Sequence, residues 1–163
     1  MAPLRMLGIG EMENVKLKIG IAVFVFIFIG GLYIFSGNER GVDEIYLLPS
    51  GFEGCVVIYY DVEGAEPLKI ENDEIVYHVP ANGLIYTSSP YDFGWVNDKH
   101  SGAFQLKAFY VDDEGDIIEE LPPEQIRFGA NGSIQRDERE IDYYYQIFGS
   151  EETEKKGCPA LDI

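Results

Sequence analysis

The fold class is decided by one stretch, Gly54-Cys-Val-Val-Ile-Tyr-Tyr-Asp61. Successive side chains of a strand point to opposite faces, so Val56, Ile58 and Tyr60 share one face and the residues between them share the other. Both faces are apolar here, which is typical of a central strand that is covered on two sides. The stretch therefore predicts a domain built around a buried sheet.

Further short strands are predicted along the chain. Residues 75–79 and 84–88 are predicted to pair around a turn that contains Asn82-Gly83. Residues 128–133 are rich in glycine and are predicted to form a loop, whereas residues 141–148 are predicted to form a last strand.

A second hairpin is predicted from residues 104–111 and 116–121, which flank the turn Asp112-Asp-Glu-Gly115. Acidic residues around a glycine also resemble a calcium loop, which needs several oxygen ligands on alternating residues. Hairpin turns favour the same residue types, and the twelve-residue helix-flanked calcium pattern is absent from the sequence. A calcium-responsive module is therefore kept as an alternative.

The pattern predicts an all-β domain, because several short strands alternate with turns and no segment keeps a 3.6-residue period. A small β-sandwich or a partly open barrel is expected over residues 45–149. Residues 36–44 are predicted to be a linker, and the charged residues 150–163 are predicted to be a disordered acidic tail.

A membrane-spanning helix is predicted at residues 19–35, which carry no charge. Lys16 and Lys18 precede it, and positive residues favour the cytoplasmic side. Residues 1–18 are thus predicted to be a cytoplasmic stub, with the β domain outside the cell membrane. A cleaved signal peptide and a buried core helix are the alternatives.

The charge of the chain bears on its partners. The net charge is −17, and residues 1–40 carry four basic and three acidic side chains, so the remainder carries −18. Such a surface repels nucleic acid and anionic lipid headgroups, which excludes a nucleic-acid partner. A self-repelling soluble surface is the plain interpretation. The other interpretation is that the acidic surface attracts cations or basic partners.

Two cysteines, Cys55 and Cys158, leave two interpretations open. An oxidising location would permit a disulfide between them. Cys55 lies in an apolar strand, however, and equally suits a small buried side chain, whereas Cys158 lies in a polar tail. Neither follows the apolar segment closely, which argues against a lipid-anchored N-terminus.

The most distinctive segment is Thr87-Ser-Ser-Pro-Tyr-Asp-Phe-Gly-Trp95. Loop aromatics such as Tyr91, Phe93 and Trp95 bind ligands or partners, or else they close one end of the core. Asp98 and His100 follow, and this pair can form an acid–base couple or ligate a metal, although the spacing arises often by chance.

Three segments within residues 45–121 carry a family resemblance: Leu47-Leu-Pro-Ser-Gly-Phe-Glu-Gly54, Thr87-Ser-Ser-Pro90 with Gly94-Trp95, and Phe109-Tyr-Val-Asp-Asp-Glu-Gly115. Through these segments the chain resembles a family of bacterial membrane-anchored or secreted proteins of unknown function. It implies the anchor and the β fold, and it implies no activity. In that family the position of Cys55 is often aromatic.

The function predicted from these features is a non-enzymatic binding or structural module at the bacterial cell envelope. Its expected partners are the membrane, through residues 19–35, and an envelope protein, peptide or polymer. No nucleophile elbow, phosphate loop, dinucleotide fingerprint or zinc motif occurs in the sequence, so no cofactor is expected. A hydrolase of envelope polymer that uses carboxylates or Asp98 and His100 is the enzymatic alternative.

Overall fold

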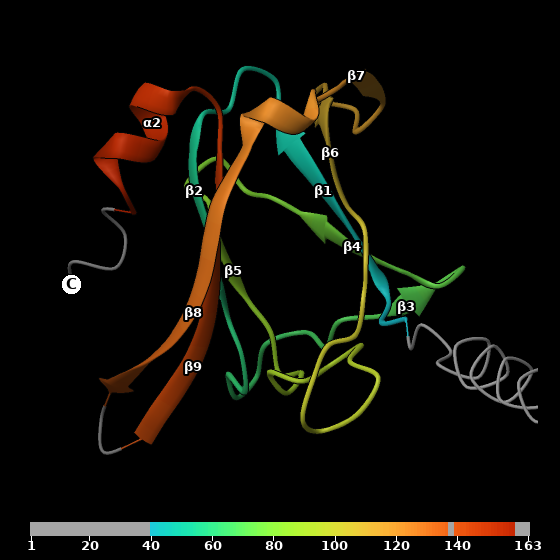
Figure 1. Ribbon diagram of the computed structural model, residues 1–163, viewed down its shortest axis with the longest axis vertical. Coiled ribbons are helices and arrows are strands. Elements are labelled where there is room, and N and C mark those ends of the chain that lie inside the picture. The colour runs from blue at the N-terminus through green and yellow to red at the C-terminus, as the bar shows by residue number, and fades with distance from the viewer. Residues whose placement is uncertain (1–39, 137–138, 159–163) are drawn as a thin grey trace, which may run out of the picture. The chain divides into compact units, whose positions relative to one another are not determined.

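A computed structural model describes residues 40–136 and 139–158. Nine strands and one short helix form in these ranges, together with a single 3-10 turn, η1, at Pro123–Gln125 (Figure 1). The elements, in chain order, are β1 (Asp43–Pro49), β2 (Gly54–Tyr59), β3 (Ile70–Glu71), β4 (Glu74–His78), β5 (Leu84–Tyr86), β6 (Leu106–Val111), β7 (Ile117–Glu120), β8 (Ile126–Arg136), β9 (Arg139–Phe148) and α2 (Glu151–Lys156).

The strands form two mixed sheets and no closed barrel, which confirms the prediction of a mostly β fold. One sheet has the order β3-β4-β1-β6-β7, and the other has the order β5-β2-β9-β8. In the first sheet β1 is central and runs parallel to both of its neighbours, β4 and β6. In the second sheet β2 is internal, parallel to β5 and antiparallel to β9.

The main core contains buried side chains from both sheets. Tyr46 of β1 is fully buried, and its ring centroid lies 4.8 Å from that of Tyr77 in β4 and 5.0 Å from that of Phe148 in β9. Aromatic rings at such spacings add packing energy to their burial, on the order of 1 kcal/mol a pair. Tyr46 therefore joins neighbouring strands of one sheet and also bridges to the other sheet.

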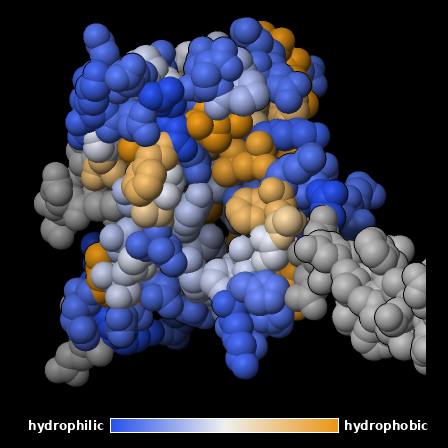
Figure 2. Space-filling model, in the orientation of Figure 1, coloured by the Kyte–Doolittle hydropathy of each residue, from blue (hydrophilic) through white to orange (hydrophobic). Residues whose placement is uncertain are grey.

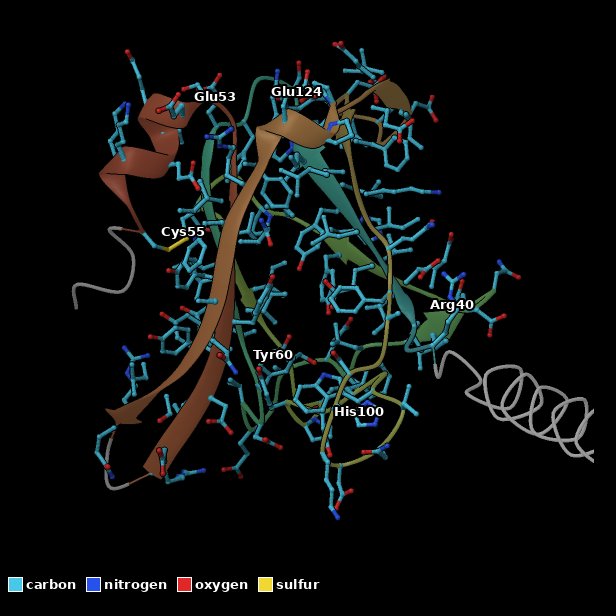
Figure 3. All side chains as sticks on the ribbon, in the orientation of Figure 1. Arg40, Glu53, Cys55, Tyr60, His100 and Glu124 are labelled. Carbon is cyan, nitrogen blue, oxygen red and sulfur yellow. A yellow bond between two sulfur atoms is a disulfide. The ribbon has the colours of Figure 1, made fainter. Side chains whose placement is uncertain are left out.

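The strand β2 is buried on both faces, as its sequence predicts. Val56 and Ile58 face the main core, whereas Val57, which is also fully buried, lies on the other face of the strand. Cys55 lies on the same face as Val57 and forms a disulfide with Cys158. The α-carbon atoms of the two cysteines are 5.3 Å apart, so the disulfide attaches the end of the described chain to β2 (Figure 3).

The predicted pairing of residues 75–79 with residues 84–88 is wrong. β4 pairs with β1 and β3 in one sheet, whereas β5 pairs with β2 in the other. The turn between them closes through a hydrogen bond from Gly83 N to Pro80 O, and Gly83 O accepts from Val57 N at 2.8 Å. Gly83 has φ +70° and lies against the Cys55 carbonyl, so the turn carries the chain across to the second sheet.

The predicted glycine-rich loop at residues 128–133 is also wrong, because these residues lie inside the eleven-residue strand β8. β8 pairs with β9 in antiparallel fashion along most of its length. A β-carbon at Gly132 would lie 2.6 Å from the Tyr143 hydroxyl oxygen, and one at Gly129 would overlap the Tyr144 hydroxyl. The glycines thus give room to tyrosines from β9.

By contrast, the predicted hairpin around residues 112–115 is present as β6 and β7.

The predicted disorder of residues 150–163 is contradicted for their first part, because Glu151–Lys156 form α2. Ser150 caps this helix by accepting a hydrogen bond from Thr153 N at 3.3 Å. Arg127 of β8 forms an ion pair with Glu154 at 2.6 Å, and Thr153 donates to Glu53 at 3.1 Å. Contacts with distant strands hold the helix, which local sequence patterns do not reveal.

The predicted stub, the predicted membrane helix and the first four residues of the predicted linker, residues 1–39 in all, lie outside the described residues. Among the residues that the structure does describe, no helix is long and apolar enough to cross a bilayer.

Removal of the disulfide should loosen the C-terminal segment. We expect Cys158→Ala to lower the free energy of unfolding by about 2–4 kcal/mol, because the bond closes a loop of 103 residues in the unfolded chain. Urea titrations with and without reductant measure the effect. Reductant should destabilise the parent protein and leave the variant unchanged. Equal midpoints for the parent in both conditions would contradict the prediction.

Candidate active or binding pocket

A pocket of about 410 Å³ lies between the two sheets and the loop that joins β5 to β6. The volume falls in the range of small-molecule sites. Figure 2 shows apolar side chains at the surface between flanking hydrophilic regions, and Figure 3 shows Tyr60 and His100 at one end of the sheets. The pocket is lined by Val42, Glu44, Tyr60, Ile75, Tyr91, Phe93, Gly94, Trp95, His100, Ser101, Phe104, Gly129, Ala130, Asn131 and Tyr144.

Glu44 is the charged group of this lining. It lies on β1 two residues before Tyr46, and the Tyr46 hydroxyl donates a hydrogen bond to Glu44 Oε2 at 3.1 Å. Burial disfavours the ionised carboxylate and raises the pKa of Glu44 to about 7, against the smaller opposing effect of the Tyr46 hydrogen bond. A carboxyl group that titrates near neutrality inside a pocket is a common feature of functional sites.

Tyrosine side chains from several elements surround Glu44. Burial is the main cause that raises the pKa values of Tyr46, Tyr60, Tyr77 and Tyr144, and the negative charge of Glu44 adds to it in each case. For Tyr144 of β9 the pKa rises to about 12. These phenols therefore stay protonated at neutral pH, and they offer hydroxyl groups and ring faces around one carboxylate.

The loop between β5 and β6 is attached to the start of β1, which places its aromatic residues beside Glu44. Val42 N donates to Gly94 O at 3.0 Å, and Glu44 N donates to Gln105 O at 2.8 Å. Gly94 has φ +82°, and a β-carbon there would lie 2.7 Å from Ile75 Cδ1. Only glycine therefore allows this loop to approach β1 and β4 so closely.

The opposite wall comes from β8 and β9. The Asn131 side chain donates a hydrogen bond to the Tyr91 hydroxyl, which connects β8 to the loop. Tyr91 also makes edge contacts with Tyr60 and Trp95, at centroid distances of 5.3 and 5.2 Å. The wall is thus an aromatic cluster with one polar connection.

The structure brings together four of the five predicted site residues: Tyr91, Phe93, Trp95 and His100 all line the pocket. Tyr91 and Phe93 also pack against the core. Asp98 is exposed and is not part of the lining. His100 Nε2 lies 3.0 Å from the Asn97 side-chain nitrogen, at the rim of the same loop.

Sequence reasoning missed Glu44, because it falls inside the predicted linker at residues 36–44. β1 begins at Asp43, so Glu44, Tyr46 and Leu48 share the inward face of a strand. The available signal was the two-residue spacing of Glu44 from Tyr46 and Leu48, which places a charged residue on the same strand face as apolar ones. This signal is informative only if the strand is known to begin before Glu44.

The acidic turn at residues 112–115 has a structural role. Asp112 Oδ1 accepts hydrogen bonds from Glu114 N at 3.1 Å and from Asp116 N at 2.9 Å, so this carboxylate closes its own turn. Within residues 40–136 and 139–158, no group of three or more histidine, cysteine, aspartate or glutamate side chains is placed to hold a metal ion.

Comparison with known proteins places this site in a family without an assigned activity. A family of unknown function, DUF6843, matches residues 40–157, which include every strand and α2. The fold is similar to a crystal structure described as "Putative Lipoprotein from Bacillus anthracis", with 28% identity and a TM-score of 0.56 over 68% of this chain and 75% of that one. No curated protein sequence matches the chain.

Glu44 should make the stability of the domain depend on pH. Its pKa is about 7 in the folded state against 4.5 as the ordinary value, so the folded protein binds the proton more tightly. Stability from this group is complete below pH 4.5 and is lost as the pH rises through 7. Relative to Glu44→Gln, the parent should lose up to about 3 kcal/mol between pH 4.5 and 8.

Urea titrations at several pH values provide the measurement. Glu71→Gln is the matched control, since Glu71 is an exposed carboxylate on β3 and should not alter the pH profile. Parallel stability curves for the parent and Glu44→Gln would show that Glu44 keeps an ordinary pKa.

Proposed function

The chain belongs to this family of unknown function, and we propose that its β domain is a non-enzymatic binding module at the bacterial cell envelope. Residues 19–35 anchor the domain in the cell membrane and leave it on the outer side. The pocket lined by Tyr91, Trp95 and Glu44 takes the ligand, which is a peptide-bearing part of the envelope polymer.

The observation that carries this proposal is the pocket itself. Six of the fifteen residues that line it are phenylalanine, tyrosine or tryptophan, and a few convergent polar groups, the Glu44 carboxylate and the Asn131 amide, fix the direction of a ligand. Binding sites for small groups have this composition. Aromatic side chains give large contact areas at low entropic cost, which suits recognition without catalysis.

Two further observations support the location. The disulfide between Cys55 and Cys158 is a bond that forms and persists in oxidising compartments outside the cytoplasm. The similar protein from Bacillus anthracis is described as a "Putative Lipoprotein", which fits an envelope location for that protein.

The hydrolase alternative is less well supported. Glycoside hydrolysis commonly needs two carboxyl groups that flank the scissile bond. Among the described residues that line the pocket, Glu44 alone carries a carboxylate, and Asp98 lies outside it. Acid–base catalysis in this pocket would therefore have to use Glu44 and His100, because the lining holds no second carboxylate.

Trp95 provides the test, because it is the sole tryptophan of the sequence and lies in the pocket wall. Solubilised peptidoglycan fragments should change its fluorescence in a saturable way. Tyr91→Ala should weaken this binding at least tenfold, because it removes two ring contacts and the Asn131 bond.

Tyr86→Ala is the matched control, since Tyr86 is 46% exposed and stacks on Tyr59, away from the pocket. It should leave binding unchanged. Circular dichroism checks that each variant is folded. If Tyr91→Ala unfolds the domain, Asn131→Ala replaces it, because Asn131 lies on an edge strand. No fluorescence response of the parent to the fragments would refute the proposed ligand.

A further inference from the structure

The second oxygen of the Glu44 carboxylate is available to a ligand. Oε2 accepts from the Tyr46 hydroxyl, and no hydrogen bond within the described residues reaches Oε1. The same part of the chain contains no side-chain oxygen that is sealed from solvent and also lacks a partner. Oε1 therefore keeps contact with the solvent of the pocket that Glu44 lines.

In the part of the chain that the structure describes, no lysine or arginine side chain pairs with Glu44. The groups that face it are phenols: Tyr46 on its own strand, Tyr77 on β4, Tyr60 after β2, Tyr144 on β9 and Tyr91 on the loop. His100 completes the titratable groups of the lining.

We infer that this pocket binds a primary ammonium group, such as the end of a lysine side chain in an envelope peptide, with Glu44 as its counter-ion. The inference rests on the proposed function and specifies the ligand chemistry of the same site. A half-buried carboxylate that lacks a cation is costly, and an ammonium group both neutralises it and donates a hydrogen bond to Oε1.

The remaining lining suits the rest of such a ligand. Ammonium groups are attracted to tryptophan and tyrosine rings, and Trp95, Tyr60 and Tyr91 are among the residues that line the pocket. Phe93 and Phe104 offer apolar contact for a methylene chain, and Phe104 is 39% exposed. The net charge of −18 on residues 41–163 raises the local concentration of cations near the site.

Binding of the cation is coupled to loss of the Glu44 proton. The protonated carboxyl has no charge to offer, so affinity should rise with pH through about 7, where Glu44 ionises. The lysine amine remains protonated throughout this range. From pH 8 to pH 5.5 the affinity should fall by roughly 30-fold, which follows from proton competition at one site.

The experiment compares two ligands of nearly equal shape, Nα-acetyl-lysine amide and Nα-acetyl-norleucine amide, by Trp95 fluorescence on the intact domain. Only the lysine derivative carries an ammonium group. It should bind at least tenfold more tightly at pH 8, and the preference should shrink at pH 5.5. Tetramethylammonium should bind more weakly than the lysine derivative, because it donates no hydrogen bond.

Glu44→Gln should abolish both the preference and the pH dependence. Loss of the pH dependence in His100→Asn would refute its assignment to Glu44, because histidine side chains ordinarily titrate in the same range. Glu71→Gln, with an exposed carboxylate changed, should behave as the parent.

Each outcome separates the two proposals. Equal binding of both derivatives, or unchanged behaviour of Glu44→Gln, would refute the ammonium ligand while leaving a binding pocket. Tighter binding of tetramethylammonium would replace the primary ammonium with a quaternary one and refute the class stated here. No binding of either derivative refutes it as well, and the response to peptidoglycan fragments then decides separately whether the pocket binds an envelope ligand.

Discussion

One side chain, Tyr46, connects the packing of the domain to its pocket. Its ring is fully buried between Tyr77 of its own sheet and Phe148 of the facing sheet, and its hydroxyl holds the Glu44 carboxylate. A strand presents every second residue to the same face, so the position of Tyr46 in the core determines that Glu44 also points inward. The core therefore places the carboxylate.

The pocket exists because the aromatic side chains at this end of the sheets leave space beside Glu44. Gly94 brings the loop against β1, and Gly129 leaves room for the Tyr144 hydroxyl on the other wall. A carboxylate in such a place disfavours its own ionised form and costs the fold stability near neutral pH. Burial accordingly raises the pKa of this carboxyl to about 7.

The C-terminal segment shows how distant contacts order a polar sequence. Residues 151–156 are charged and short, and isolated helices of this length are unstable in water. The disulfide to Cys55, the Arg127–Glu154 ion pair and the Thr153–Glu53 hydrogen bond supply the missing stabilisation. None of these contacts is visible in the local pattern, which explains why disorder was the natural expectation for residues 150–163.

The sequence by itself determined the strand-rich character of residues 43–148, the burial of β2 on both faces and the aromatic loop that lines the pocket. These features follow from side-chain alternation and turn residues, which act over a few positions. Only the tertiary structure decided that β4 and β5 belong to different sheets, that Gly129 and Gly132 lie within a strand, and that Glu44 lines the same pocket as Tyr91 and Trp95. These three features depend on which strands become neighbours. The sequence of a strand does not by itself specify the strand with which it forms hydrogen bonds.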